Sequence, residues 1–92
     1  KHGVEGLTKA LAWDLGAEKI RVNTICPTFV QTDMTKRMFE DETFKASVLA
    51  KIALGELVTT EDLMGAVVFL ASPAARMITG SAIVVDGGWT AA

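Results

Sequence analysis

Two short segments rich in β-branched residues are the strand patterns of this 92-residue chain, and each follows a helical segment. Residues 20–26 stop at Pro27, and residues 81–85 stop at the turn Asp86-Gly87-Gly88. Strands that alternate with helices in this order form a parallel sheet covered by helices. Because two strands do not make a stable sheet alone, we expect their neighbours to come from residues outside this chain or from another chain.

The helical segments have clear start and stop signals. Residues 3–15 predict an amphipathic helix, which Gly16 is placed to end in a left-handed cap. A second helical region is predicted from residue 33 to 54, where Gly55 ends it. Thr59 and Asp62 match a capping box for a third helix that runs to about Ser72. This third helix is apolar nearly all round, so we expect both of its flanks to be covered. The apolar stripe of the first helix is Val4, Leu7, Leu11 and Leu15, and that of the second is Phe44, Val48, Leu49 and Ile52.

Composition excludes several classes of protein. Half of the residues are hydrophobic, which is high for a small domain and favours part of a larger protein. A net charge of −2 gives no basic surface for nucleic acid or an anionic membrane. The longest apolar run, residues 66–71, is too short to span a bilayer, and no secretory leader is visible. One cysteine cannot form an internal disulfide, so we expect a reducing compartment, the cytoplasm.

No complete chemical site assembles from the residue types alone. The single histidine, His2, and the single cysteine, Cys26, form no ligand cluster, so no metal site is predicted. We interpret Cys26 as a buried thiol at the end of a strand and His2 as a helix-surface residue. Gly87-Gly88 lacks the G-x-G-x-x-G spacing of a phosphate loop and predicts a tight turn with positive φ.

Seven segments form an ordered set: residues 1–12 (KHGVEGLTKALA), 20–27 (IRVNTICP), 30–34 (VQTDM), 61–63 (EDL), 69–72 (FLAS), 78–80 (ITG) and 84–89 (VVDGGW). Together they resemble the short-chain dehydrogenase/reductase family in order and spacing, over essentially the whole chain. The resemblance implies that residues 1–92 are the C-terminal portion of a doubly wound, parallel-sheet (Rossmann-like) NAD(P)-binding domain whose N-terminal half is absent. It also implies an oxidoreductase that transfers a hydride between NAD or NADP and a carbonyl or secondary alcohol.

The resemblance assigns a role to the first residue. Lys1 matches the lysine of the family's Tyr-x-x-x-Lys motif, so the tyrosine would precede the chain. By this likeness Lys1 binds the nicotinamide ribose hydroxyls, and its charge lowers the pKa of the tyrosine, which becomes a usable acid and base near neutral pH.

The loop after the first strand is the second piece that the resemblance marks. Pro27 to Val30 would lie against the nicotinamide, with the Val30 backbone holding the carboxamide. Thr32 would bind the carboxamide or the pyrophosphate, or would simply cap the next helix, and both roles stay open. Thr28 stands where the family usually has glycine, and we expect its β-branched side chain to narrow or hydroxyl-line the substrate pocket.

Residues 35–55 correspond to the family's variable substrate-binding region. Met34, Met38 and Phe39 are candidates for the pocket lid, and ordinary core packing is the alternative for each. The substrate class implied is a small carbonyl or alcohol, and the tail with Trp89 loosely resembles relatives that oxidise sugars or polyols. Relatives form homotetramers through the helix that matches residues 3–15 and through the last helix and strand.

Two hypotheses about function follow from these observations. In the first, the chain belongs to an oxidoreductase but is inactive by itself, because it lacks the glycine-rich loop, the catalytic serine and the tyrosine. In the second, it is a non-catalytic association module built from the same elements. Residues encoded before Lys1 would distinguish the two.

Overall fold

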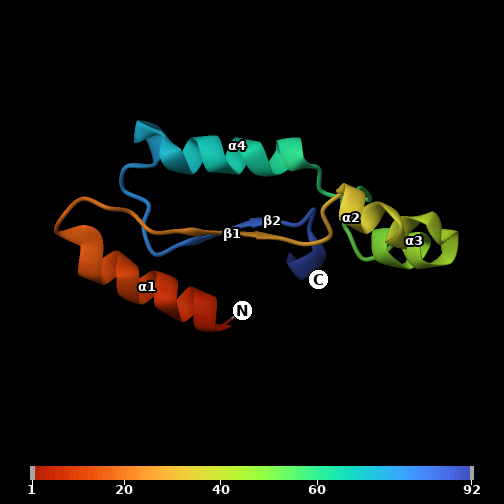
Figure 1. Cartoon of the computed structure of the whole chain (residues 1–92), viewed down its shortest axis with the longest axis horizontal. Coiled ribbons are helices and arrows are strands. Elements are labelled where there is room, and N and C mark those ends of the chain that lie inside the picture. Colours follow the sequence, from red (N-terminus) through yellow and green to blue (C-terminus); the bar gives the residue numbers. More distant parts are fainter. Residues whose placement is uncertain (1, 92) are drawn as a thin grey trace. The chain divides into compact units, whose positions relative to one another are not determined.

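The computed structural model describes residues 2–91 and has its helices and strands in the predicted order (Figure 1). The chain is therefore an α/β protein, which confirms the predicted fold class. Its elements are α1 (His2–Gly16), β1 (Thr24–Pro27), α2 (Asp33–Lys36), η1 (Met38–Glu40), α3 (Glu42–Leu49), α4 (Thr60–Ala71), η2 (Pro73–Ala75), β2 (Ala82–Val85) and η3 (Trp89–Ala91).

β1 and β2 are neighbours in one two-stranded sheet. Next to them, the Gly80 amide donates to the Val22 carbonyl (2.8 Å), and the Thr24 amide donates to the Ser81 carbonyl (3.0 Å). Residue numbers increase in the same direction along both hydrogen-bonded segments, so the strands run parallel. The parallel sheet predicted from the helix–strand alternation is thus confirmed.

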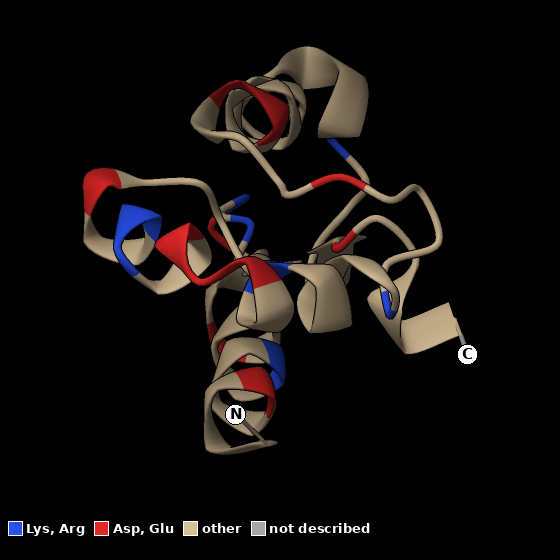
Figure 2. Cartoon of the chain, turned by 90° about the vertical axis from the view of Figure 1, so that its right-hand side faces the viewer, with Lys and Arg blue, Asp and Glu red and all other residues tan. Residues whose placement is uncertain are grey.

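The chain divides into two units, one of residues 2–26 with 65–84 and the other of residues 27–64 with 85–91. In the first unit, α1 lies along one face of the strand pair and residues 65–71 of α4 lie along the other (Figures 1 and 2). A helix on each face is the arrangement expected of a parallel sheet, because such sheets are covered on both sides.

Small residues, rather than the predicted stripe, form the packed face of α1. Ala12 is buried, and a Cβ added to Gly80 would lie 3.4 Å from the Ala12 Cβ. The Lys9 Nζ donates to the Gly80 carbonyl at 2.8 Å across the same contact. Val4 and Leu7 of the predicted stripe are exposed among the residues described. The small side chain of Ala12 allows a close approach of backbone, whereas the stripe is only partly covered, with Leu11 and Leu15 half-buried.

The first strand is shorter than the predicted residues 20–26. In its first half, side chains supply part of the bonding, and the Val22 amide donates to the Thr79 hydroxyl oxygen (3.1 Å). The guanidinium of Arg21 donates to the carbonyls of Leu70 (2.6 Å) and Ile78 (3.4 Å). Residues 20–23 therefore tie the end of α4 to the segment before β2, and β-branched composition alone did not distinguish this from a strand.

The predicted left-handed cap at Gly16 is wrong. α1 includes Gly16, and the residue with positive φ is Lys19 (63°). The Ile20 amide donates to the Leu15 carbonyl (3.3 Å), and the Lys19 amide donates to the Gly16 carbonyl (3.0 Å). This pair of bonds is a Schellman motif with a lysine in the position that glycine usually takes.

The predicted helical region from residue 33 to 54 is divided into α2, η1 and α3. Asp41 starts α3, because its carboxylate accepts from the amides of Thr43 (3.0 Å) and Phe44 (3.2 Å). A strong N-cap in the middle of a helical pattern ends one helix and begins another. The predicted helix end at Gly55 is wrong, because α3 ends at Leu49, and Gly55 has a φ of 72° in the segment that follows. Gly87 and Gly88 have positive φ, as predicted for their turn.

The start of α4 is as predicted. The Thr59 amide donates to Asp62 Oδ2 (2.8 Å), and the Asp62 amide donates to Thr59 Oγ1 (3.2 Å), which completes the capping box. Figure 2 shows acidic residues at this end of α4, and the rest of its sequence, residues 63–71, contains no charged residue. The expected covering of both flanks is not met among residues 2–91, where no residue of α4 is buried.

A core of aromatic and aliphatic residues forms in the second unit. Phe39, Val48 and Ile52 are buried at its centre. Partly buried hydrophobic residues surround them: Phe29, Phe44, Leu49, Leu57 and Trp89. In the part of the chain that the structure describes, no helix is long and apolar enough to cross a membrane.

Candidate functional site

The loop that follows β1 lies at the carboxyl end of a parallel strand. Ligands of open parallel sheets bind outside this end of the strands, where the loops leave the sheet. Pro27 is exposed, while Thr28, Phe29 and Val30 are half-buried, and residues 27–32 carry no charge. The loop therefore offers backbone and hydroxyl groups as hydrogen-bond partners for a ligand, and no charged side chain.

A β-bridge orients Val30 within this loop. Val30 pairs in parallel with the buried Val58, and the partners of Val58 are the residues on either side of Val30. The Val58 amide donates to the Phe29 carbonyl (3.2 Å), and the Gln31 amide donates to the Val58 carbonyl (2.7 Å). Since backbone groups alternate in direction along an extended segment, the N–H and C=O of Val30 itself point away from Val58.

Thr32 caps α2, which confirms one of its two predicted roles. Its Oγ1 accepts from the Thr35 amide (3.3 Å), and its own amide donates to Thr35 Oγ1 (3.0 Å). The same Thr35 hydroxyl donates to the Val30 carbonyl at 2.6 Å. Sequence reasoning missed Thr35, although the spacing Thr-x-x-Thr places it where a capping box has its second side chain.

Phe29 anchors the loop to the core of the second unit. Its ring centroid lies 5.8 Å from that of Phe39, 6.3 Å from that of Phe44 and 5.7 Å from that of Trp89. The contacts with Phe39 and Phe44 are edge-to-face, a favoured geometry for aromatic rings. Val30 thus follows a residue whose ring packs against three other aromatic rings.

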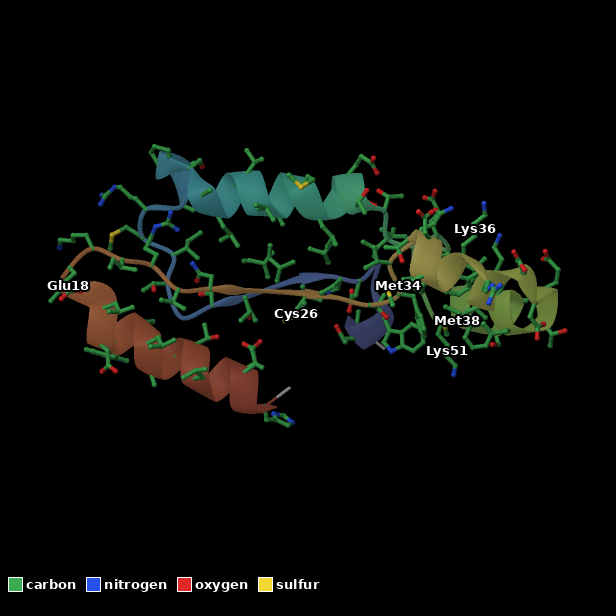
Figure 3. All side chains as sticks on the ribbon, viewed as in Figure 1. Glu18, Cys26, Met34, Lys36, Met38 and Lys51 are labelled. Atoms are coloured by element: carbon green, nitrogen blue, oxygen red, sulfur yellow. The ribbon has the colours of Figure 1, made fainter. Side chains whose placement is uncertain are left out.

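The three candidates for the pocket lid differ in their surroundings. Phe39 is only 8% exposed, so core packing, the alternative considered for it, accounts for this residue. Met34 is 89% exposed and Met38 is 47% exposed, so core packing among residues 2–91 accounts for neither of them (Figure 3). Their assignment to a pocket lid, and the effect of Thr28 on the pocket, stay predictions.

The remaining candidates lie at the start of the chain and on β1. Lys1 lies outside the described residues, and His2 is exposed on α1, as predicted. Cys26 is half-buried rather than buried (Figure 3). Its Sγ donates to Glu5 Oε1 at 3.5 Å. The Thr24 hydroxyl donates to the same Glu5 oxygen at 2.8 Å. Glu5 therefore gives both side chains a polar partner that the strand pattern did not reveal.

A buried carboxylate organises the turn that carries Trp89. Asp86 accepts from the hydroxyl (2.7 Å) and amide (3.0 Å) of Thr90 and from the amide of Gly88 (2.9 Å). These bonds favour the ionised form, so the hydroxyl of Thr90 first, and then the two amides, lower the pKa of Asp86. The carboxylate thereby fixes Trp89 beside Phe29.

The family is decided by comparison with known proteins. The family model described as enoyl-(acyl carrier protein) reductase matches residues 1–90. The chain belongs to the short-chain dehydrogenase/reductase family. It is 42% identical over 88 residues to a 3-oxoacyl-[acyl-carrier-protein] reductase of Vibrio harveyi, covering 96% of this chain and 35% of that protein. The chain thus spans about a third of the length of the curated relatives it matches.

Solved structures of this short-chain family have the same fold. One, from Agrobacterium tumefaciens, is described as a 2-deoxy-D-gluconate 3-dehydrogenase and contains NADP. It has a TM-score of 0.94 and 42% identity, over 99% of this chain and 37% of that one. A 4-hydroxyisoleucine dehydrogenase in complex with NADH gives a TM-score of 0.95 at 36% identity, over 99% of this chain and 37% of that one.

Proposed function

We propose that this chain is the C-terminal portion of an oxidoreductase that transfers a hydride between NAD or NADP and a carbonyl or secondary alcohol. The observation that carries the proposal is the family match across residues 1–90. Two similar structures hold NADP and NADH, which supports a nicotinamide cofactor for this chain. The coverage of about a third of a relative supports a partial Rossmann-like domain over residues 1–92.

The loop after β1 fits the nicotinamide carboxamide. A carboxamide needs both a hydrogen-bond acceptor and a donor, and the backbone of one residue in extended conformation supplies both on one side. The bridge with Val58 gives Val30 this orientation. Thr32 would add its hydroxyl, and Pro27 and Thr28 would line the ring. When bound, the cofactor supplies the hydride chemistry, and the protein supplies position and electrostatics.

Lys1 completes the proposed cofactor contacts. We assign it to the ribose hydroxyls and to lowering the pKa of a tyrosine that precedes it in the intact enzyme, as the family resemblance implies. A positive charge beside a phenol stabilises the phenolate, so the tyrosine can exchange a proton near neutral pH.

The proposal extends to the substrate class, the oligomeric state and the cellular compartment. The structure described as a 2-deoxy-D-gluconate 3-dehydrogenase supports a sugar or polyol, and the 3-oxoacyl-[acyl-carrier-protein] reductase supports a 3-oxoacyl group. Exposed apolar residues on α1 and along α4 and β2 support a homotetramer formed through these elements. The single free cysteine supports a reducing compartment such as the cytoplasm.

The same exposed faces favour a second candidate function. Val4, Leu7 and Trp13 on α1, with Val67 and Val68 on α4, are exposed apolar side chains that a binding partner could cover. In this candidate the chain is an association module without catalysis. The two candidates differ in cofactor binding, which only the oxidoreductase requires.

The proposal is tested on the intact protein that carries this sequence. We expect it to bind NADH or NADPH and to oxidise the bound form with a sugar or 3-oxoacyl substrate. Replacing Lys1 by methionine should lower kcat by about two orders of magnitude, because the tyrosine loses its positive neighbour. Arg76→Met is the control for the loss of a positive charge and should leave kcat unchanged, because Arg76 is exposed and lies outside residues 35–55. Failure of the intact protein to bind either dinucleotide would overturn the oxidoreductase.

A further inference from the structure

The hydroxyl of Thr35 joins two residues of the loop that the proposed function assigns to the cofactor. It donates to the Val30 carbonyl (2.6 Å) and accepts from the Thr32 amide (3.0 Å). The Thr32 carbonyl (3.2 Å) and hydroxyl (3.3 Å) are also near, but both lie farther away than the Val30 oxygen. A hydroxyl has one proton to donate and two lone pairs, so these two main bonds are compatible.

The bond to Val30 fixes a whole peptide plane. The carbonyl of Val30 and the amide of Gln31 belong to one planar peptide group and point in opposite directions. Val58 holds the amide end, since the Gln31 amide donates to its carbonyl at 2.7 Å. Thr35 holds the carbonyl end. With both ends bonded, the plane cannot rotate, whereas without Thr35 only the bridge restrains it.

The position of Thr35 within α2 supports this role. The other residues of this four-residue helix are exposed, and Thr35 alone is half-buried. Partial burial reduces competition from water for its hydrogen bonds. The carbonyl of Val30 has two lone pairs, so the bond from Thr35 leaves a second one for a ligand donor.

We propose that Thr35 is a positioning residue of the cofactor loop, whose hydroxyl holds the backbone of Val30 and Thr32 in the conformation that receives the nicotinamide carboxamide. This inference rests on the proposed function. It adds a residue that touches no cofactor itself and acts through Val30 and Thr32. By holding the loop in this conformation before the cofactor binds, Thr35 reduces the conformational entropy that the loop loses on binding.

The experiment compares Thr35→Val with Thr35→Ser in the intact protein. Valine keeps the shape and removes the hydroxyl, whereas serine keeps the hydroxyl. We expect Thr35→Val to raise the Kd for NADH or NADPH, and the KM for that cofactor, about three- to tenfold, the effect of one lost hydrogen bond. Serine should restore both values, and the KM for the carbonyl substrate should stay unchanged. Thr60→Val is the control and should leave both values unchanged, because Thr60 is exposed, lies outside residues 35–55, and bonds through its hydroxyl only to the adjacent Glu61 side chain among the contacts of residues 2–91.

Each outcome decides the inference. If the wild type binds a dinucleotide and Thr35→Val binds it equally well, Thr35 has no positioning role and the proposed function stands. A loss that serine does not restore also overturns the role, because the retained hydroxyl is then not sufficient to hold the loop. If the wild type binds neither dinucleotide, the proposed function fails and this inference fails with it. Should Thr35→Val not fold, Thr35→Ser against Thr35→Ala makes the same comparison, and an equal Kd in both overturns the role.

Discussion

At the scale of single residues, Asp86 shows how one carboxylate determines the place of a large side chain. Its three hydrogen bonds come from the turn at Gly88 and Thr90, and the residue between them, Trp89, packs on Phe29. Sequence reasoning predicted the turn from its glycines. It did not identify the contact with Phe29, because that contact joins residues far apart in the sequence.

The lowered pKa of Asp86 makes a prediction about acid stability. Its folded pKa lies below the ordinary value of 3.8, so the carboxylate stabilises the folded state above that value and loses this effect as pH falls through the folded pKa. Asp86→Asn should therefore be less stable than the wild type in urea at about pH 7, with a smaller difference at about pH 2. Asp14→Asn, on the exposed surface of α1, is the matched control. A difference that is independent of pH would contradict this account.

Single residues also mark the limit of prediction at the site. The Thr32 cap followed from the sequence, because a cap depends on neighbours in the chain. The orientation of Val30 did not, because it depends on Val58, which lies beyond three helical segments. Pro27, Thr28 and Val30 came from the family resemblance, and their contacts with a cofactor stay predictions.

At the scale of elements, the prediction was correct where one local signal acted alone. It was wrong where two local signals competed in the same segment. Helix α4 and its capping box were predicted because Thr59 and Asp62 satisfy each other. The region from residue 33 to 54 was predicted as one helix because its apolar spacing hid the cap at Asp41. The left-handed cap was predicted at Gly16, but the chain adopts it at Lys19, where the bonds to Leu15 and Gly16 offset the cost of positive φ.

The capping box of α4 is itself testable. Thr59→Ala removes the acceptor for the Asp62 amide, and we expect it to lower the free energy of unfolding by about 1 kcal/mol. Thr60→Ala is the control, since Thr60 is the exposed neighbour and its hydroxyl bonds only to the adjacent Glu61 side chain among the contacts of residues 2–91. Chemical denaturation of both variants measures the difference. Equal losses would show that the box adds nothing to the start of α4.

At the scale of the whole molecule, the exposed apolar surface is the main departure from a self-sufficient domain. Trp13 is 88% exposed, and Met64, Val68 and Val84 are also exposed. Exposed apolar side chains in this number are covered in a complete protein by other residues or by other subunits. Each unit in this chain therefore offers faces that the described residues leave uncovered.

This surface predicts the behaviour of the 92-residue chain when it is made alone. We expect it to aggregate in sedimentation experiments and to give no steady oxidation of NADH or NADPH with any substrate of the intact protein. The reason is that its exposed apolar faces lack their partners and that it contains no tyrosine. A folded, monodisperse oligomer would favour the association module, and steady turnover would contradict the expected inactivity.

The bridge between Val30 and Val58 also has a consequence for the order of events during synthesis. A chain emerging from the ribosome exposes Val30 well before Val58, and α2, η1 and α3 lie between them. Pairing across this interval must first overcome the entropy of closing the intervening loop, which the compact helical segments shorten. The loop after β1 therefore cannot complete this bridge until the chain has been synthesised as far as Val58.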